Sequence, residues 1–192
     1  MKLQKTTWGL VIAASFLTTF VYFYEVAGKS QQEVNAAKQR QIFDFTKDDI
    51  AGFTIEREDE ETLAFVKSDR EASSWQMEQP EESPASDPAV SFLLDLLVDG
   101  ERDRLILGRS EELEEYGLDN PLATISVDIE DRSESPVLVL GGENFDGKFI
   151  YARANPEGEE TEEFEIILVP IDFKYAMERE LEEWQASTTD EE

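Results

Sequence analysis

The feature that most constrains this chain is an apolar run without a single charge, TTWGLVIAASFLTTFVYFY, over residues 6–24. An α-helix rises about 1.5 Å per residue, so this run would span roughly 28 Å, close to the thickness of the hydrocarbon core of a bilayer. The run therefore predicts a transmembrane helix, through which the chain contacts the bilayer.

The residues around this run predict its orientation. Lys2 and Lys5 precede it, and Glu25 is the first residue after it. Because positive residues stay on the cytoplasmic side, residues 1–5 are expected in the cytoplasm and the rest of the chain on the exoplasmic side. Aromatic residues at both ends fit the interface belts of a membrane protein: Trp8, Tyr22 and Tyr24.

A cleaved signal peptide is the alternative interpretation of this run. Val26-Ala27-Gly28 would serve as a small-residue cleavage site. The apolar part of a signal peptide is about 7–15 residues long, however, whereas this run is longer and ends in bulky aromatic residues. The retained anchor is preferred, and the cleaved signal stays open.

Composition excludes several kinds of site. The 192 residues include no Cys and no His, which excludes disulfides, thiolate nucleophiles, Cys- or His-ligated metals and Ser-His-Asp triads. The formal net charge is −28, and the part after residue 24 carries all 45 acids against 15 of the 17 basic residues. Such a surface predicts no nucleic-acid binding, because phosphate contacts need clustered Lys and Arg. It would attract a basic partner or, weakly, divalent cations.

The chain after the apolar run divides into three parts. Residues 25–41 contain the polar stretch KSQQEVNAAKQRQ and predict a helical juxtamembrane stalk, with a flexible linker as the alternative. Residues 42–184 predict an α+β domain: a mostly antiparallel sheet with one or two covering helices. Residues 185–192, QASTTDEE, predict a disordered acidic tail.

Apolar alternation and turn residues predict the strands of this domain. They are expected at 53–55, 63–66, 74–77, 104–107, 123–129, 137–140, 149–152 and 164–169. A turn with Gly141-Gly142 and Asp146-Gly147 is expected to join two of them as a hairpin.

Three helices are expected in the domain. The clearest covers 87–99, starts at a Ser86 or Asp87 cap and ends at Gly100. Its apolar residues share one face, which should lie on the sheet: Val90, Leu93, Leu94 and Leu97. A short acidic helix is expected over 110–116, closed by Gly117. A last helix, opened by Pro170, would carry Phe173, Ala176, Met177, Leu181 and Trp184.

No catalytic residue, cofactor site or metal ligand is predicted. Acid pairs are frequent, but a carboxylate mechanism needs two acids around a cleft, one of them in a setting that holds its proton. The segment Glu143–Gly147 resembles part of a calcium loop but lacks the full ligand pattern, so a hairpin tip is preferred. Trp75, Met77 and Trp184 are candidates for an exposed apolar contact with a partner, with a place in the core as the alternative.

Several segments follow one another in a recognisable order. They are IFDFTKDDIAGFTIER, WQMEQP, PASDPAVSFLLDLL, EEYGLDNPLATISV, LVLGGENFDGKFIYAR and IILVP. Together with the anchor, their order resembles the bacterial DUF4340 domain family over residues 1–184. The most specific parts are the stretch from Trp75 to Pro88 and the stretch from Tyr116 to Pro121.

The resemblance implies no catalytic residues, because the family is a domain of unknown function. Some members are similar to or accompany auxiliary components of gliding-type ABC transport systems, and short single-anchor forms occur in cyanobacteria. The exoplasmic space would then be the periplasm or the thylakoid lumen.

The sequence thus predicts a single-pass, membrane-anchored and non-enzymatic accessory or scaffold protein, with an integral membrane protein complex as its partner. One alternative is an auxiliary subunit of an ABC-type transport system, which rests on the resemblance alone. A further alternative is a carboxylate-based hydrolase or a ligand-binding module.

Overall fold

The computed structural model describes residues 40–58, 61–68, 74–156 and 163–186. The chain divides into two compact units, Met1–Arg40 and Gln41–Glu192. The predicted span over 6–24, with its interface residues Trp8, Tyr22 and Tyr24, lies outside the described residues, as does the predicted stalk up to residue 39. Within the described part of the chain, no helix is long and apolar enough to cross a bilayer.

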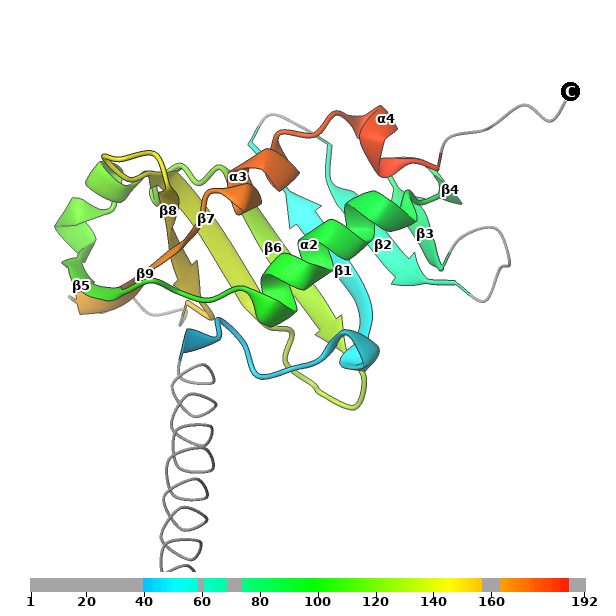
Figure 1. Cartoon of the computed structure of the whole chain (residues 1–192), viewed down its shortest axis with the longest axis horizontal. Helices are drawn as coiled ribbons and strands as arrows, with labels where there is room; N and C mark the ends of the chain where they lie inside the picture. Colours follow the sequence, from blue (N-terminus) through cyan, green and yellow to red (C-terminus); the bar gives the residue numbers. More distant parts are fainter. Residues whose placement is uncertain (1–39, 59–60, 69–73, 157–162, 187–192) are drawn as a thin grey trace, which may run out of the picture. The chain divides into compact units, whose positions relative to one another are not determined.

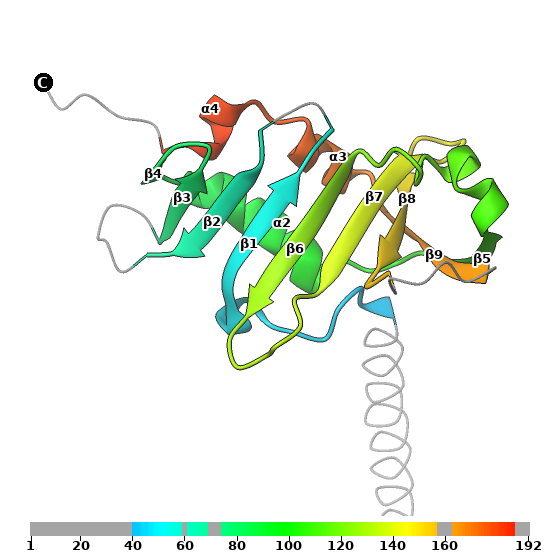
Figure 2. The ribbon, with the colours of Figure 1, turned by 180° about the vertical axis from the view of Figure 1, so that it is seen from behind.

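The described part of the second unit is built on one nine-stranded sheet (Figures 1 and 2). The order across the sheet is β4-β3-β2-β1-β6-β7-β8-β9-β5, and every neighbouring pair is antiparallel. The strands are β1 (Ile50–Glu56), β2 (Leu63–Lys67), β3 (Trp75–Gln79), β4 (Ser83–Pro84), β5 (Leu105–Arg109), β6 (Ala123–Ile129), β7 (Val137–Glu143), β8 (Phe149–Ala154) and β9 (Glu163–Pro170).

Helices cover one face of this sheet. They are α2 (Asp87–Asp99), α3 (Asp172–Met177) and α4 (Leu181–Trp184), and α2 contacts both of the others. Figure 1 shows these helices in front of the sheet, and Figure 2 shows the opposite face with the helices behind it. Short 3₁₀ turns are η1 (Lys47–Asp49), η2 (Ser110–Glu112) and η3 (Glu114–Tyr116). The prediction of a mostly antiparallel α+β domain is therefore confirmed.

Helix α2 forms where the apolar period of its sequence predicts it. Ser86 stands at the N-cap in an extended conformation, and Pro88 occupies the first turn, where no backbone donor is needed. The carboxylate of Asp87 accepts a hydrogen bond from the backbone N–H of Ser74 at 3.1 Å, which ties the start of the helix to β3. The helix ends at Gly100, as predicted.

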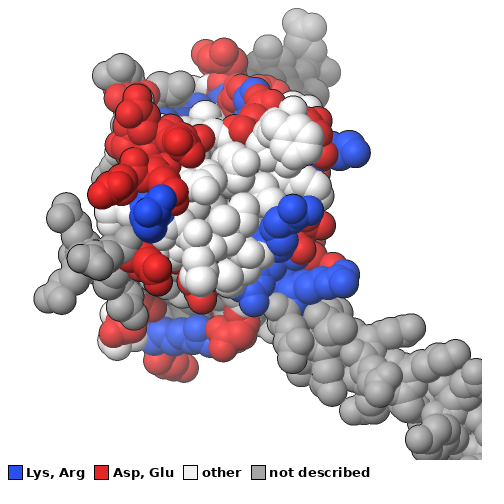
Figure 3. All heavy atoms as spheres, turned by 90° about the vertical axis from the view of Figure 1, so that its left-hand side faces the viewer, with Lys and Arg blue, Asp and Glu red and all other residues white. Residues whose placement is uncertain are grey.

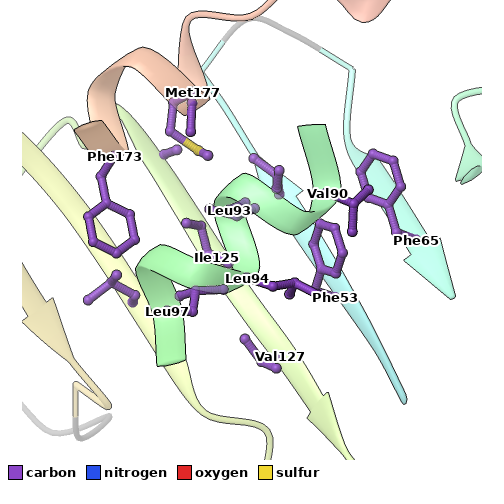
Figure 4. Packing of buried hydrophobic residues seen from close by; sticks show 14 of the residues in the cluster. Phe53, Phe65, Val90, Leu93, Leu94, Leu97, Ile125, Val127, Phe173 and Met177 are labelled. Carbon is purple, nitrogen blue, oxygen red and sulfur yellow. The ribbon is translucent and has the colours of Figure 1, made fainter. Parts of the chain in front are cut away.

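The main core lies between α2 and the sheet. The residues of α2 that are buried share one side of the helix: Ala89, Val90, Leu93, Leu94 and Leu97. Figure 4 shows this side packed between Phe53 and Phe65 on one flank and Phe173 and Met177 on the other, above Ile125 and Val127. Each of these side chains is almost fully buried, so apolar burial is the main force that holds the helix on the sheet.

A second, smaller apolar cluster lies on the opposite face of the sheet. Alternation along β9 separates the two clusters, because Ile167 and Val169 belong to the main core while Phe164 and Ile166 belong to the second cluster. Side chains from the 113–118 segment pack against it: Leu113, Tyr116 and Leu118. This segment, which contains η3, therefore covers the β7–β9 end of the face that the helices leave open.

The predicted last helix is wrong in two respects. Pro170 ends β9 instead of opening a helix, and the helical stretch breaks into α3 and α4. The guanidinium of Arg57 donates hydrogen bonds to the carbonyl oxygens of Met177 and Arg179 at 2.9 and 3.1 Å. Because the side chain of Arg57, which directly follows β1, satisfies these carbonyls, the backbone can leave the helix there.

Two shorter predictions also need correction. The expected helix over 110–116 consists of the two 3₁₀ turns η2 and η3, although Gly117 does close it, with a left-handed φ of 63°. Gly141 and Gly142 belong to β7, where the pairing with β8 shifts register, and the hairpin turn follows them.

The described domain is slightly longer at both ends than the predicted 42–184. Gln41 forms an isolated antiparallel bridge with Glu101. At the other end, Gln185 bridges Ala85, and the backbone N–H of Ala186 donates to the carbonyl of Pro84 at 2.8 Å. Residues 185 and 186 are thus part of the fold, and the rest of the predicted tail lies outside the described residues.

Candidate interaction surface

The described acids are distributed over the surface. Of the described polar and charged side chains, only Gln76 is buried. Hydrogen bonds from Thr46 lower the pKa of Asp49, and hydrogen bonds from Arg109 lower the pKa of Glu112. A lowered pKa keeps a carboxyl group ionised, which is the opposite of what a general acid needs at neutral pH. Neither of these two described carboxyl groups is therefore a candidate general acid.

The segment Glu143–Gly147 forms the tip of the β7–β8 hairpin. Oδ1 of Asn144 accepts hydrogen bonds from the backbone N–H groups of Lys148 and Phe149, each at 3.2 Å. Asp146 accepts a further one from Lys148 at 3.2 Å, and Glu143 forms an ion pair with Lys174. These oxygens thus stabilise the turn, and no group of three or more Asp or Glu side chains that could hold a metal ion gathers in the described part of the chain.

Gly117 and Gly141 allow close packing between the 116–118 segment and β7. A Cβ on Gly117 would lie 2.7 Å from the backbone nitrogen of Gly142, and a Cβ on Gly141 would lie 2.4 Å from the carbonyl oxygen of Tyr116. Only glycine lets the 116–118 segment approach β7 this closely. The ring of Tyr116 then packs edge-on against that of Tyr151, with 4.9 Å between centroids. The structure thus gives these glycines a packing role.

The candidate contact residues Trp75, Met77 and Trp184 are buried. Their exposed fractions are 7%, 0% and 0%. The ring of Trp184 packs on Phe65 and that of Trp75 on Phe53, with 5.4 and 5.5 Å between centroids. The apolar contact surface predicted from these three residues is therefore wrong, and the alternative role in the core is correct. Trp75 and Met77 point inward because they lie two residues apart on β3 and so share one face of the sheet. Trp184 points inward because α4 lies over β2.

Strand β5 instead exposes apolar side chains. Leu105 is 41% and Leu107 is 66% exposed, whereas Ile106 between them packs on the second cluster. β5 pairs with β9 through the register Leu105↔Ile167 to Arg109↔Glu163, and among the described residues nothing pairs with its other side. A strand edge with unpaired backbone groups and apolar side chains is a template for pairing with another strand.

The charges around this edge are unevenly placed. Figure 3 views the β5–β9 end of the molecule and shows a broad uncharged area, with most acids of this view gathered on one side and several Lys and Arg on the opposite side. In the sequence, the mixed segment Glu101-Arg102-Asp103-Arg104 precedes the strand, and Glu111 and Glu112 follow it. At the far end of β5, Arg109 forms an ion pair with Glu112 at 2.9 Å.

The sequence predicted this strand but not its exposure. From its sequence, this apolar strand could lie at the centre of a sheet or at its edge. Its position depends on pairing with β9, which lies more than fifty residues later in the chain. The available signal was the difference between the two sides of the strand. Leu105 and Leu107 share one side, and Ile106 and the small Gly108 share the other.

These features define an α+β domain with one antiparallel sheet, helices on one face and an open edge strand at one end. The chain belongs to the DUF4340 family, described as a domain of unknown function, whose sequence profile matches residues 75–189. The resemblance predicted from the sequence is thereby confirmed, with the match starting at β3. Comparison with curated proteins and with solved structures gives no match.

Proposed function

We propose that this protein is a membrane-anchored, non-enzymatic assembly protein. The run over 6–24 would hold it in the bilayer, with residues 1–5 in the cytoplasm and the α+β domain in the exoplasmic space. The domain would make protein–protein contacts through the open edge of β5, as an accessory or scaffold component of a membrane protein complex.

The exposed edge of β5 carries this proposal. Leu107 is 66% exposed on a strand that pairs with no other described strand on its outer side, where Glu112 accepts a hydrogen bond from the backbone N–H of Arg109. An added strand would gain main-chain hydrogen bonds from this edge and apolar contacts from Leu105 and Leu107, which is a common mode of peptide and protein recognition.

A matched pair of substitutions tests the role of this edge. Leu107→Lys places a charge on the strand edge, where lysines oppose pairing with another strand. Tyr175→Lys is the control, because Tyr175 on α3 is 57% exposed and gains the same charge. Affinity purification of the full chain from detergent-solubilised membranes is expected to recover a stoichiometric partner with wild type and with Tyr175→Lys, and to lose it with Leu107→Lys.

Each result decides a separate part of the proposal. Recovery of the wild-type protein alone, in repeated purifications, would overturn the scaffold role. Equal recovery by both variants would show that β5 is not the contact. A partner set that contains an ATPase and a permease would identify the complex as the ABC-type transporter implied by the resemblance.

Membrane topology needs its own experiment. Protease added to right-side-out vesicles should digest the membrane-bound protein to a small anchored fragment. A protected domain would reverse the proposed orientation. A soluble domain shortened by about 28 residues would identify a cleaved signal peptide and remove the anchor from the proposal.

A further inference from the structure

The tip of the β7–β8 hairpin holds an aromatic side chain out in solvent. Phe145 is 98% exposed, more than any other large apolar side chain among the described residues. Single exposed apolar residues are common on protein surfaces, so exposure alone identifies no contact. The turn that carries Phe145 and the surface beside it provide the further observations.

The turn that carries Phe145 has a fixed shape. The backbone N–H of Asn144 donates to the carbonyl oxygen of Phe149 at 2.9 Å, and that of Gly147 donates to the carbonyl oxygen of Asn144 at 3.1 Å. Oδ1 of Asn144 accepts two further backbone hydrogen bonds, and Gly147 supplies the left-handed φ of 67° that the turn requires. Because this backbone is already ordered, a contact made by Phe145 costs little additional ordering.

An open pocket lies at the base of the same hairpin. Its volume is about 310 Å³, the share of about ten water molecules in the liquid, which is enough for one aromatic ring. The residues around it include Gly117, Asn120, Leu122, Gly142, Ile150 and Lys174. Leu122 and Ile150 give it apolar walls, and the two glycines leave it free of side chains on one side. Glu143, only two residues before Phe145, also lines it, so the pocket and the exposed ring are neighbours on the surface.

We propose that two copies of this chain associate through these hairpins, with Phe145 of each copy in the pocket of the other. The chain itself supplies both halves of the contact: an exposed ring on a fixed turn and an apolar pocket of matching size. Because ring and pocket are neighbours, one two-fold axis between them fills both pockets at once. The contact does not use β5, so this inference goes beyond the proposed function and does not depend on it.

Apolar burial has to hold this contact, because electrostatics opposes it. The chain has a formal net charge of −28, so two copies repel each other. The lysines beside the pocket already contact acids of their own copy: Lys174 pairs with Glu143 and Glu178, and Lys148 with Asp146. Salt shortens the range of the repulsion, to about 8 Å at physiological ionic strength. Association through the two rings should therefore become stronger as salt is added.

Photo-cross-linking tests the contact in the full-length chain in its membranes. The probe is p-benzoylphenylalanine, a photoreactive analogue of Phe, placed at position 145. Illumination should give a covalent dimer, several-fold more abundant than with the same probe at Glu134, an exposed residue in the loop at the other end of β7. Mass spectrometry should find the attachment on the pocket of the second copy, within residues 117–122 or 142–150 or at Lys174.

Two substitutions test the two halves of the contact separately. Phe145→Ser removes the ring, and Asn120→Arg places a bulky side chain at the pocket. Each should reduce the co-purification of two differently tagged copies at least tenfold, whereas Phe145→Leu should retain it. Because Asn120→Arg also makes the chain less negative, charge alone would favour association, so a loss indicates a blocked pocket. Both positions are exposed, and unchanged thermal unfolding midpoints would show that the variants are folded.

Other outcomes overturn the proposal. A dimer yield no higher than with the probe at Glu134 rules out the contact. A dominant adduct with lipid or with a different protein rules out a second copy as the occupant. Loss of co-purification with Phe145→Ser but not with Asn120→Arg rules out the pocket as the receiving site. None of these results bears on the contact proposed for β5, because these variants leave that strand unchanged.

Discussion

Gly117 and Gly147 form a natural matched pair for testing how the 116–118 segment packs on the sheet. Both residues have a left-handed backbone, with φ of 63° and 67°. A Cβ on Gly117 would lie 2.7 Å from the backbone nitrogen of Gly142, whereas a Cβ on Gly147 would meet nothing closer than 3.8 Å, the side chain of Glu143. Substitution by Ala therefore imposes the same conformational strain at both sites, and a steric conflict at Gly117 alone.

The expected loss of stability follows from these two terms. An L-residue in the left-handed region costs about 1–2 kcal/mol, and the reduced freedom of the unfolded chain on Gly→Ala returns about 0.4–1 kcal/mol. Gly147→Ala should therefore destabilise the domain by about 1 kcal/mol. At Gly117 the neighbour is backbone and cannot rotate away, so an overpacking cost of about 1–3 kcal/mol is added. Gly117→Ala should destabilise by about 2–4 kcal/mol.

Urea unfolding of the two variants and the wild type, followed by tryptophan fluorescence, gives the free energies of unfolding by linear extrapolation. Amide exchange in the 116–118 segment should also rise in Gly117→Ala and not in Gly147→Ala, because Tyr116 and Leu118 would be lifted from the second cluster. Equal destabilisation by the two substitutions would refute the close packing of this segment on β7.

Two further predictions concern the core and an ion pair. Leu93→Ala, at a fully buried position of α2, should destabilise by about 2–5 kcal/mol, and Leu96→Ala, partly buried on the same helix, by clearly less in the same urea experiment. Similar losses would contradict the observed orientation of α2. The pKa of Glu112, lowered by hydrogen bonds from the guanidinium and the backbone N–H of Arg109, should lie below that of an ordinary Glu in an NMR titration. It should rise in Arg109→Gln, which removes the guanidinium and keeps the backbone N–H. Because the pKa of Glu112 is lower in the folded state, the ion pair with Arg109 stabilises the fold at pH values above the ordinary Glu pKa. This stabilisation is lost as the pH falls through the lowered pKa of Glu112. An ordinary pKa for Glu112 in the wild type would contradict the presence of this ion pair.

Local patterns were sufficient for the elements whose own side chains define them. In β6, Ile125 and Val127 alternate with polar residues, and they lie on the buried side as alternation predicts. In α2, the apolar residues recur at helical spacing between a Pro and a Gly that mark its ends. Gly117 likewise closes its segment with the positive φ that favours glycine.

Predictions failed where distant residues intervene. The continuous last helix predicted after Pro170 is broken. Arg57, about 120 residues earlier in the chain, donates hydrogen bonds to the carbonyl groups of Met177 and Arg179 at the break. Trp184 near the chain end gave no local signal for its environment, and its burial depends on Phe65. Such contacts join residues more than a hundred positions apart, and periodicity within one segment carries no information about them.

The candidate site shows the same division. The apolar run over residues 105–107 predicts a strand, but only the position of β5 beside β9 at the end of the sheet makes it an edge and leaves Leu105 and Leu107 exposed. Composition and periodicity were enough for the α+β class and the covering helix, because each depends on residues near one another in the chain. The family came from a resemblance in the order of sequence segments, which is also read along the chain. The order of the strands, and with it the surface open to a partner, was decided by the tertiary structure, since the same apolar strand is buried at the centre of a sheet and exposed at its edge.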